Sequence, residues 1–171
     1  HGDKGSFLLE VGNERLLLER GGRPYHEPVH LFMERSDWHN LLLPLDEQGN
    51  PLVQRPATTA GGTLPTARRL PDGTLLLCSE QGGAWEEDWV QRVRRRVISP
   101  RPDLFVFDDE MLLQRPAACA WHLNSSLPFT QEDDGYWWLR TERTALCLAP
   151  LNWTRAETAS DVAGVDLYEQ P

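Results

Sequence analysis

The sequence predicts an all-β protein, an antiparallel β-sandwich, and three observations support this prediction. Short apolar or alternating segments with the composition of strands recur along most of the chain. Thirteen proline and thirteen glycine residues place turn signals between these segments. No segment shows the sustained 3.6-residue apolar period of a long amphipathic helix. Short strands with turn-rich connections are typical of two packed antiparallel sheets.

The first predicted element is a hairpin over residues 7–19, closed by a two-residue turn at Gly12-Asn13. This turn sets Glu10 opposite Arg15, which is a favourable cross-strand charge pair. The same register gives the pairs Val11–Glu14 and Leu9–Leu16, a core face of Phe7, Leu9, Leu16 and Leu18, and Ser6 opposite Glu19 on the second face.

The central part of the chain is predicted to be a long, mostly irregular segment followed by a strand. Residues 44–71 are rich in Pro, Gly and Thr and leave room for one short strand. Pro71-Asp72-Gly73 is a strong turn signal, and it leads into a predicted strand over residues 74–78.

Residues 89–98 fit a strand or a short helix, and we favour a strand. In a strand, Arg92, Arg94 and Arg96 share one face, and Val93 and Val97 share the other. Residues 104–107 are predicted to form a buried strand that ends in a turn at Asp108-Asp109. Further strands are expected at 118–123, 136–140 and 144–148, with a short one at 165–168.

Bulk properties limit the class of protein. A chain of 171 residues forms one domain, residues 1–171, and buries a core without metal or disulfide staples. The net charge of −9 and the pI near 5.0 argue against a nucleic-acid partner. No apolar run reaches membrane-spanning length, so we expect no membrane partner. Cys78, Cys119 and Cys147 lack CxxC spacing and are expected to be buried thiols on strands, which leaves the redox compartment open.

Residues 26–30, His-Glu-Pro-Val-His, spell the HExxH signature of zinc peptidases. That motif requires a helix, where the two imidazoles share a face. Pro28 removes a backbone donor and clashes with the preceding turn, and Gly21-Gly22-Arg23-Pro24 excludes a helical approach. We therefore reject a metallopeptidase site here.

Three motifs in the first quarter of the chain carry a family resemblance. The chain opens with His1-Gly2-Asp3-Lys4-Gly5-Ser6-Phe7, continues with Glu19 shortly before Gly21-Gly22, and then shows Trp38-His39-Asn40 before an apolar run. This pattern resembles the heparinase II/III-like polysaccharide lyases. The resemblance implies that the chain is the β-sandwich half of a longer protein, whose partner is an N-terminal helical toroid domain.

The resemblance also implies a Zn²⁺ site formed by His1, Glu19 and His39. Neutral imidazoles and a carboxylate are suitable zinc ligands. Glu19 stands where the family more often has Asp, and it is one methylene longer. A regular strand would place His1 and Ser6 on opposite faces, and His1 would then point away from Glu19, which lies opposite Ser6. A bend at Gly2 or Gly5 could bring His1 back toward Glu19, so we expect one there.

The activity implied by the resemblance is β-elimination on the uronic acid units of an acidic glycan. We expect Tyr25 to be this domain's catalytic contribution, and Arg23, Arg94 and Trp137 to bind substrate. Most proton-transfer groups of the family lie on the toroid. We therefore expect the isolated chain to fold without catalysing the reaction.

Two other functions are compatible with the residues. A non-catalytic carbohydrate-binding or scaffold module would present a row of outward-facing Trp side chains and bind no metal. A small cupin-type metalloenzyme would use four side chains that converge inside a barrel, namely His26, His30, Glu34 and His39.

Overall fold

The computed structural model describes residues 2–19, 33–55 and 61–151 of the 171-residue chain. Within these residues, eleven strands form four sheets, and every strand pair is antiparallel, which confirms the predicted fold class. The strands are β1 (Leu9–Val11), β2 (Glu14–Leu17), β3 (Leu42–Pro44), β4 (Thr63–Arg69), β5 (Leu75–Glu80), β6 (Val90–Arg101), β7 (Leu104–Leu113), β8 (Cys119–Trp121), β9 (Thr130–Gln131), β10 (Trp137–Arg140) and β11 (Ala145–Leu148). Two 3-10 turns, η1 (Ser36–Trp38) and η2 (Gly82–Ala84), lie between strands. No helix in the described part of the chain is long and apolar enough to cross a bilayer.

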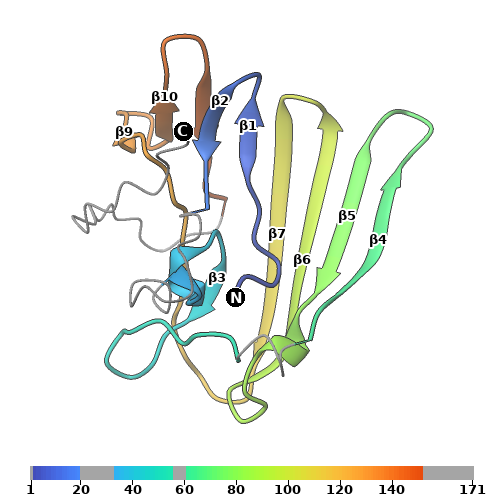
Figure 1. Ribbon diagram of the computed structural model, residues 1–171, viewed down its shortest axis with the longest axis vertical. Coiled ribbons are helices and arrows are strands. Elements are labelled where there is room, and N and C mark those ends of the chain that lie inside the picture. The colour runs from blue at the N-terminus through green and yellow to red at the C-terminus, as the bar shows by residue number, and fades with distance from the viewer. Residues whose placement is uncertain (1, 20–32, 56–60, 152–171) are drawn as a thin grey trace, which may run out of the picture.

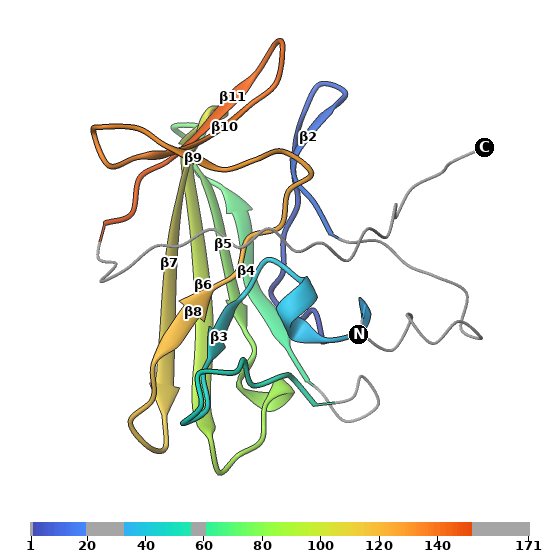
Figure 2. The ribbon, with the colours of Figure 1, turned by 90° about the vertical axis from the view of Figure 1, so that its left-hand side faces the viewer.

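The largest sheet has the strand order β4-β5-β6-β7 and forms one layer of the sandwich. Figure 2 shows the β3–β8 pair and η1 on one face of this sheet. The β1–β2 and β10–β11 hairpins stand side by side at the same end of the molecule (Figure 1). A hydrogen bond of 2.5 Å from Thr141 Oγ1 to Glu14 Oε2 joins these two hairpins.

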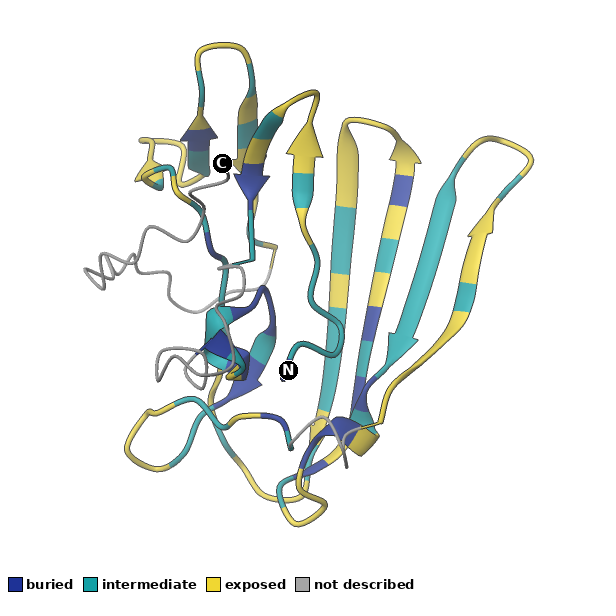
Figure 3. Ribbon diagram, in the orientation of Figure 1, coloured by how far each residue is buried: buried dark blue, intermediate teal, exposed yellow. Residues whose placement is uncertain are grey.

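The main core lies between β3, η2 and the inner face of β6 and β7. Burial alternates along most of β6, as expected for a strand with one face on the core (Figure 3). The core cluster consists of Leu41, Leu43, Ala84, Trp85, Val90 and Val93, with Leu52, Trp89, Met111 and Leu113 packed against it.

The expectation that the strand starting at residue 104 ends at Asp108-Asp109 is wrong. Strand β7 continues to Leu113 because its three acidic residues pair in register with three arginines of β6. The pairs are Arg94–Glu110, Arg95–Asp109 and Arg96–Asp108. The expected burial of residues 104–107 is also wrong at the start of the strand, since Leu104 and Phe105 are exposed.

The β1–β2 hairpin confirms the predicted Glu10–Arg15 charge pair, with Arg15 Nε 2.8 Å from Glu10 Oε1. The predicted Leu9–Leu16 pair is wrong, because Leu9 pairs with Leu17. Leu16 is the extra residue of a β-bulge. Its side chain and that of Leu17 are both buried, which a regular strand would not allow for neighbouring residues.

Other sequence expectations have mixed outcomes. The turn before β5 is confirmed, and Gly73 adopts a φ of +90° there. The segment of residues 44–71 contains strand β4, whose seven residues make it longer than the one short strand expected there. All three cysteines are free and lie on strands, but Cys119 and Cys147 are exposed instead of buried. The predicted strand at 165–168 lies outside the described residues.

Candidate metal centre

Glu19 and His39, two of the three predicted zinc ligands, lie in contact. Glu19 follows β2 and His39 follows η1. The Glu19 carboxylate meets the Nδ1 atom of His39 through Oε2, and the imidazole is buried. The third predicted ligand, His1, lies outside the described residues. A carboxylate and an imidazole are thus gathered at one point, and both are groups that zinc accepts.

Ser6 contacts the second oxygen of the same carboxylate. Its hydroxyl donates to Glu19 Oε1, which agrees with the predicted placement of these two side chains on one face. The backbone N–H of Asn40 donates to Ser6 Oγ at 3.0 Å. Because a backbone N–H can only donate, the single hydroxyl proton of Ser6 is left for Glu19. The direction of this bond is therefore defined, and Oε1 is its acceptor.

Asn40 is fully buried and holds the segments that carry Ser6 and Glu19. Its Nδ2 atom donates to the carbonyl of Phe7 at 2.6 Å and to that of Leu18 at 3.2 Å. Its Oδ1 atom accepts the backbone N–H of Asn124 at 2.7 Å, which fixes the orientation of the amide. Asn40 thus adjoins His39 in the chain and binds the chain neighbours of Ser6 and Glu19.

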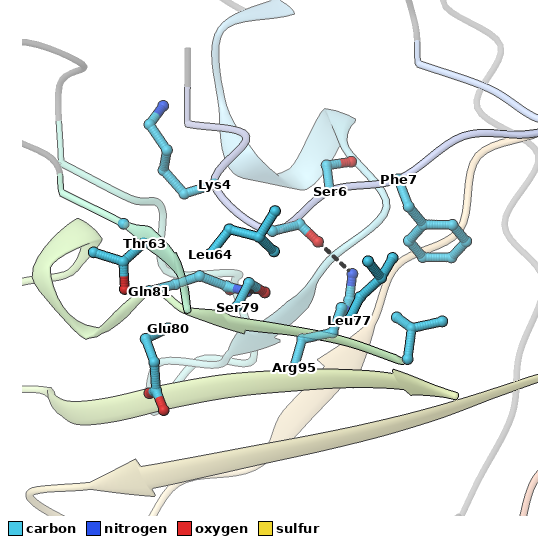
Figure 4. Close-up of a pocket in the computed structure, with 13 residues that line it drawn as sticks. Lys4, Ser6, Phe7, Thr63, Leu64, Leu77, Ser79, Glu80, Gln81 and Arg95 are labelled. Carbon is cyan, nitrogen blue, oxygen red and sulfur yellow. Dashed lines mark hydrogen bonds between the residues drawn. The ribbon is translucent and has the colours of Figure 1, made fainter. Parts of the chain in front are cut away.

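An ion pair between a buried arginine and a partly buried aspartate adjoins this network. Arg95 on β6 donates from Nε and Nη2 to the two carboxylate oxygens of Asp109 on β7, both at 2.7 Å. Its Nη1 atom donates to the Gly5 carbonyl at 2.6 Å and to the Asn40 carbonyl at 3.0 Å. Figure 4 shows the bond to Gly5 as a dashed line. One guanidinium therefore connects the large sheet to the N-terminal segment and to the His39-Asn40 segment.

The N-terminal segment is held by further bonds. The buried side chain of Gln54 accepts the backbone N–H of Lys4 and donates to its carbonyl, both at 2.9 Å. The Gly2 N–H donates to the Glu34 carbonyl at 2.6 Å. Gly5 adopts a φ of +88°, so one of the two predicted bend positions is confirmed. The bend lies between Lys4, whose backbone is bound to Gln54, and Ser6, whose hydroxyl is bound to Glu19.

A hollow of about 370 Å³ lies between this segment and strands β4, β5 and β6 (Figure 4). Lys4, Thr63 and Glu80 are among its lining residues, with Leu77 and Val97 as apolar neighbours. Several of its polar groups bond to protein groups. The Lys4 ammonium pairs with Asp3, Glu80 with Arg94, and Gln81 with Ser79.

Two of the three predicted substrate-binding residues, Arg94 and Trp137, are described, and neither contacts Glu19 or His39. Arg94 projects from the face of β6 opposite to Arg95 and donates to Glu80 Oε1 at 2.5 Å. Glu80 is also the main cause that raises the pKa of Arg94. The ion pairs of Arg94 with Glu80 and Glu110 favour a structural role for Arg94 within the sheet. Trp137 is half-buried on β10 in the three-stranded sheet. Arg23, Tyr25 and the rejected HExxH segment lie outside the described residues.

His122 directly follows strand β8. Its backbone exchanges hydrogen bonds with Leu41 at 2.8 and 3.1 Å, and its side chain is half-buried. Burial lowers the pKa of His122, and the nearby Asp37 carboxylate partly opposes this effect. The imidazole is therefore neutral at pH 7.

The buried arginine is the residue that the sequence analysis missed. Its signal is visible in hindsight, because Arg95 falls between Val93 and Val97 on the predicted apolar face. A charge on such a face requires a partner. The sequence places the partner, Asp109, in a predicted turn, whereas the structure places it on strand β7 opposite Arg95.

Comparison with known proteins agrees with these motifs. The family model described as Heparinase II/III-like, C-terminal matches residues 1–164. The chain therefore belongs to this family, a family of polysaccharide lyases. No curated protein and no solved structure gives a significant match.

We predict that Asn40→Ala destabilises the protein strongly. The change leaves two partly buried carbonyls and one buried N–H without their bonds to the Asn40 side chain, and each such loss costs about 1–3 kcal/mol. The free energy of unfolding, measured in urea, should fall by about 3 kcal/mol. The matched control is Asn50→Ala, because the Asn50 amide bonds only to Asp46 in an exposed turn. Equal losses for the two variants would contradict the organising role of Asn40.

Proposed function

We propose that this domain forms one wall of the substrate cleft of a lyase that cleaves uronate-containing glycans. Membership of the heparinase II/III-like family is the observation that carries this proposal. β-Elimination requires that the uronate carboxylate is neutralised, that a base removes the proton at C5, and that an acid protonates the departing oxygen. The proton-transfer groups of such a lyase would lie mainly on a helical toroid domain of the same protein, with Tyr25 as this domain's contribution.

We further propose that His1, Glu19 and His39 hold a Zn²⁺ ion. The contact between the Glu19 carboxylate and the buried His39 imidazole supports this, since both groups suit zinc. No set of three or more ligating side chains is gathered among the described residues, which do not include His1. Bound zinc would supply a positive charge that polarises an adjacent oxygen. Ser6 and Asn40 would help to hold the ligands in place. Ser6 bonds to the Glu19 carboxylate, and Asn40 bonds to the carbonyl of Leu18, which precedes Glu19.

The alternative, a carbohydrate-binding module, gains no support from the tryptophans. Six of the seven Trp residues lie in the described ranges, and none of them is exposed. Trp85 is buried in the core, and Trp121 packs against Phe7 and Phe107. The Nε1 atoms of Trp137 and Trp138 are shielded from solvent. No fully exposed indole is therefore available for sugar stacking within residues 2–19, 33–55 and 61–151.

Elemental analysis of the purified protein tests the metal site. We expect about one zinc per native chain, as for a site with two imidazoles and a carboxylate. His39→Ala should lose the ion because it removes a ligand. His122→Ala is the control, since it removes an imidazole that is not part of the proposed set. Retention of zinc in His39→Ala, or its absence from the native protein, would contradict the proposed site.

An elimination assay tests the lyase role. A panel of uronate-containing glycans is incubated, one at a time, with the zinc-loaded protein. The ultraviolet absorbance of the unsaturated uronate product is then followed. We expect product when the helical domain is present and none from residues 1–171 alone, because proton-transfer groups are missing and each contributes about 10²–10⁴ in rate. Product formation by this domain alone would refute its role as a cleft wall, and no product in either case would refute the lyase assignment.

A further inference from the structure

We propose that Ser6 is a positioning residue that aims the Glu19 carboxylate at His39 and so makes a glutamate effective as a metal ligand at this position. This inference rests on the metal site proposed above. It concerns how the Glu19 side chain, which is longer than that of an aspartate, is held in place.

The extra methylene of glutamate gives Glu19 one more rotatable bond than aspartate. Ordering such a side chain costs rotamer entropy, up to about 1.5–2 kcal/mol for a long polar residue. The Glu19 side chain is also 24% exposed, so water competes for its carboxylate. Without a fixed partner, the carboxylate would turn between solvent and His39.

Ser6 supplies that partner at the correct oxygen. Its hydroxyl occupies Oε1, which leaves Oε2 directed at His39 Nδ1. Because the Asn40 N–H consumes a lone pair of the same hydroxyl, its proton cannot turn toward that N–H. A hydrogen bond to a carboxylate is roughly twice as strong as a neutral one, so this contact is sufficient to select one orientation.

The position of Ser6 itself is determined by the surrounding bonds. The preceding residue, Gly5, is bound through its carbonyl to Arg95, and the following residue, Phe7, is bound through its carbonyl to Asn40. Both partner side chains are buried. The Ser6 hydroxyl is thus presented by a backbone that is anchored on both sides, which is the property that a positioning residue requires.

The test is the zinc dissociation constant, measured by chelator competition. Ser6→Ala should raise Kd about 10–100-fold, as for other residues that orient metal ligands. Ser6→Thr, which keeps the hydroxyl, should restore most of the affinity. In a Glu19→Asp background, where the shorter side chain no longer reaches Ser6, Ser6→Ala should change Kd much less. The two substitutions are therefore expected to be coupled.

Ser99→Ala is the matched control. Ser99 is a buried serine on β6 whose hydroxyl donates to the Arg101 carbonyl at 2.8 Å, away from Glu19. Its loss should lower thermal stability without changing Kd. A native Kd in Ser6→Ala, or an equal shift in Ser99→Ala, would overturn the proposal while leaving the metal site intact.

Crystal structures of the metal-free native protein and Ser6→Ala separate this proposal from the metal site. If the native protein binds no zinc, the metal site fails, but the orientation of Glu19 is still measurable. A carboxylate that leaves His39 only in Ser6→Ala supports positioning by Ser6. A carboxylate that stays beside His39 in both structures overturns it.

Discussion

Arg95 and Asp109 form an ion pair inside the sandwich, and two chain segments from outside the large sheet are bound to it. Four of the five N–H groups of the guanidinium are used, two by the Asp109 carboxylate and two by the carbonyls of Gly5 and Asn40. The aromatic rings of Phe7 and Phe107 lie 5.2 and 5.7 Å from the same cation. Through these contacts the sheet determines where the candidate site lies, since Asn40 adjoins His39 and Gly5 adjoins Ser6.

The contribution of this pair is better described as positioning than as net stability. Burial of two charges costs several kcal/mol, and their attraction offsets this only with good geometry. The bidentate fork and the two carbonyl bonds supply that geometry. An apolar pair of similar volume could give a domain of equal stability, but it could not bind the Gly5 and Asn40 carbonyls. The exposed pair Arg96–Asp108, one residue further along β6, lacks these additional bonds and contributes about 0–1 kcal/mol.

The sequence predicted those features that depend on neighbouring residues. The Gly12-Asn13 turn, the Glu10–Arg15 pair and the outward arginines of β6 each follow from a local pattern. The bulge at Leu16 did not, because only tertiary packing explains why two adjacent leucines are both buried. The Asn40 network was also missed, since its side chain bonds to main-chain groups 33 and 84 residues away, and residue types do not reveal such bonds. The candidate ligands could therefore be named from a family motif, while the contacts that hold Glu19 and His39 in place could not be predicted.

Amide hydrogen exchange in Arg95→Lys tests the central claim most directly. Lysine keeps the charge but loses the planar fork, so it cannot hold Asp109 and both carbonyls together. We predict that the Asn40 amide, which donates to Ser6, and the Gly2 amide, which donates to Glu34, exchange much faster than in the native protein. Amides between β4 and β5 should be little affected, and Arg96→Lys should leave all of these rates unchanged. Native exchange rates at Asn40 and Gly2 in Arg95→Lys, or an equal acceleration at every amide, would contradict the account.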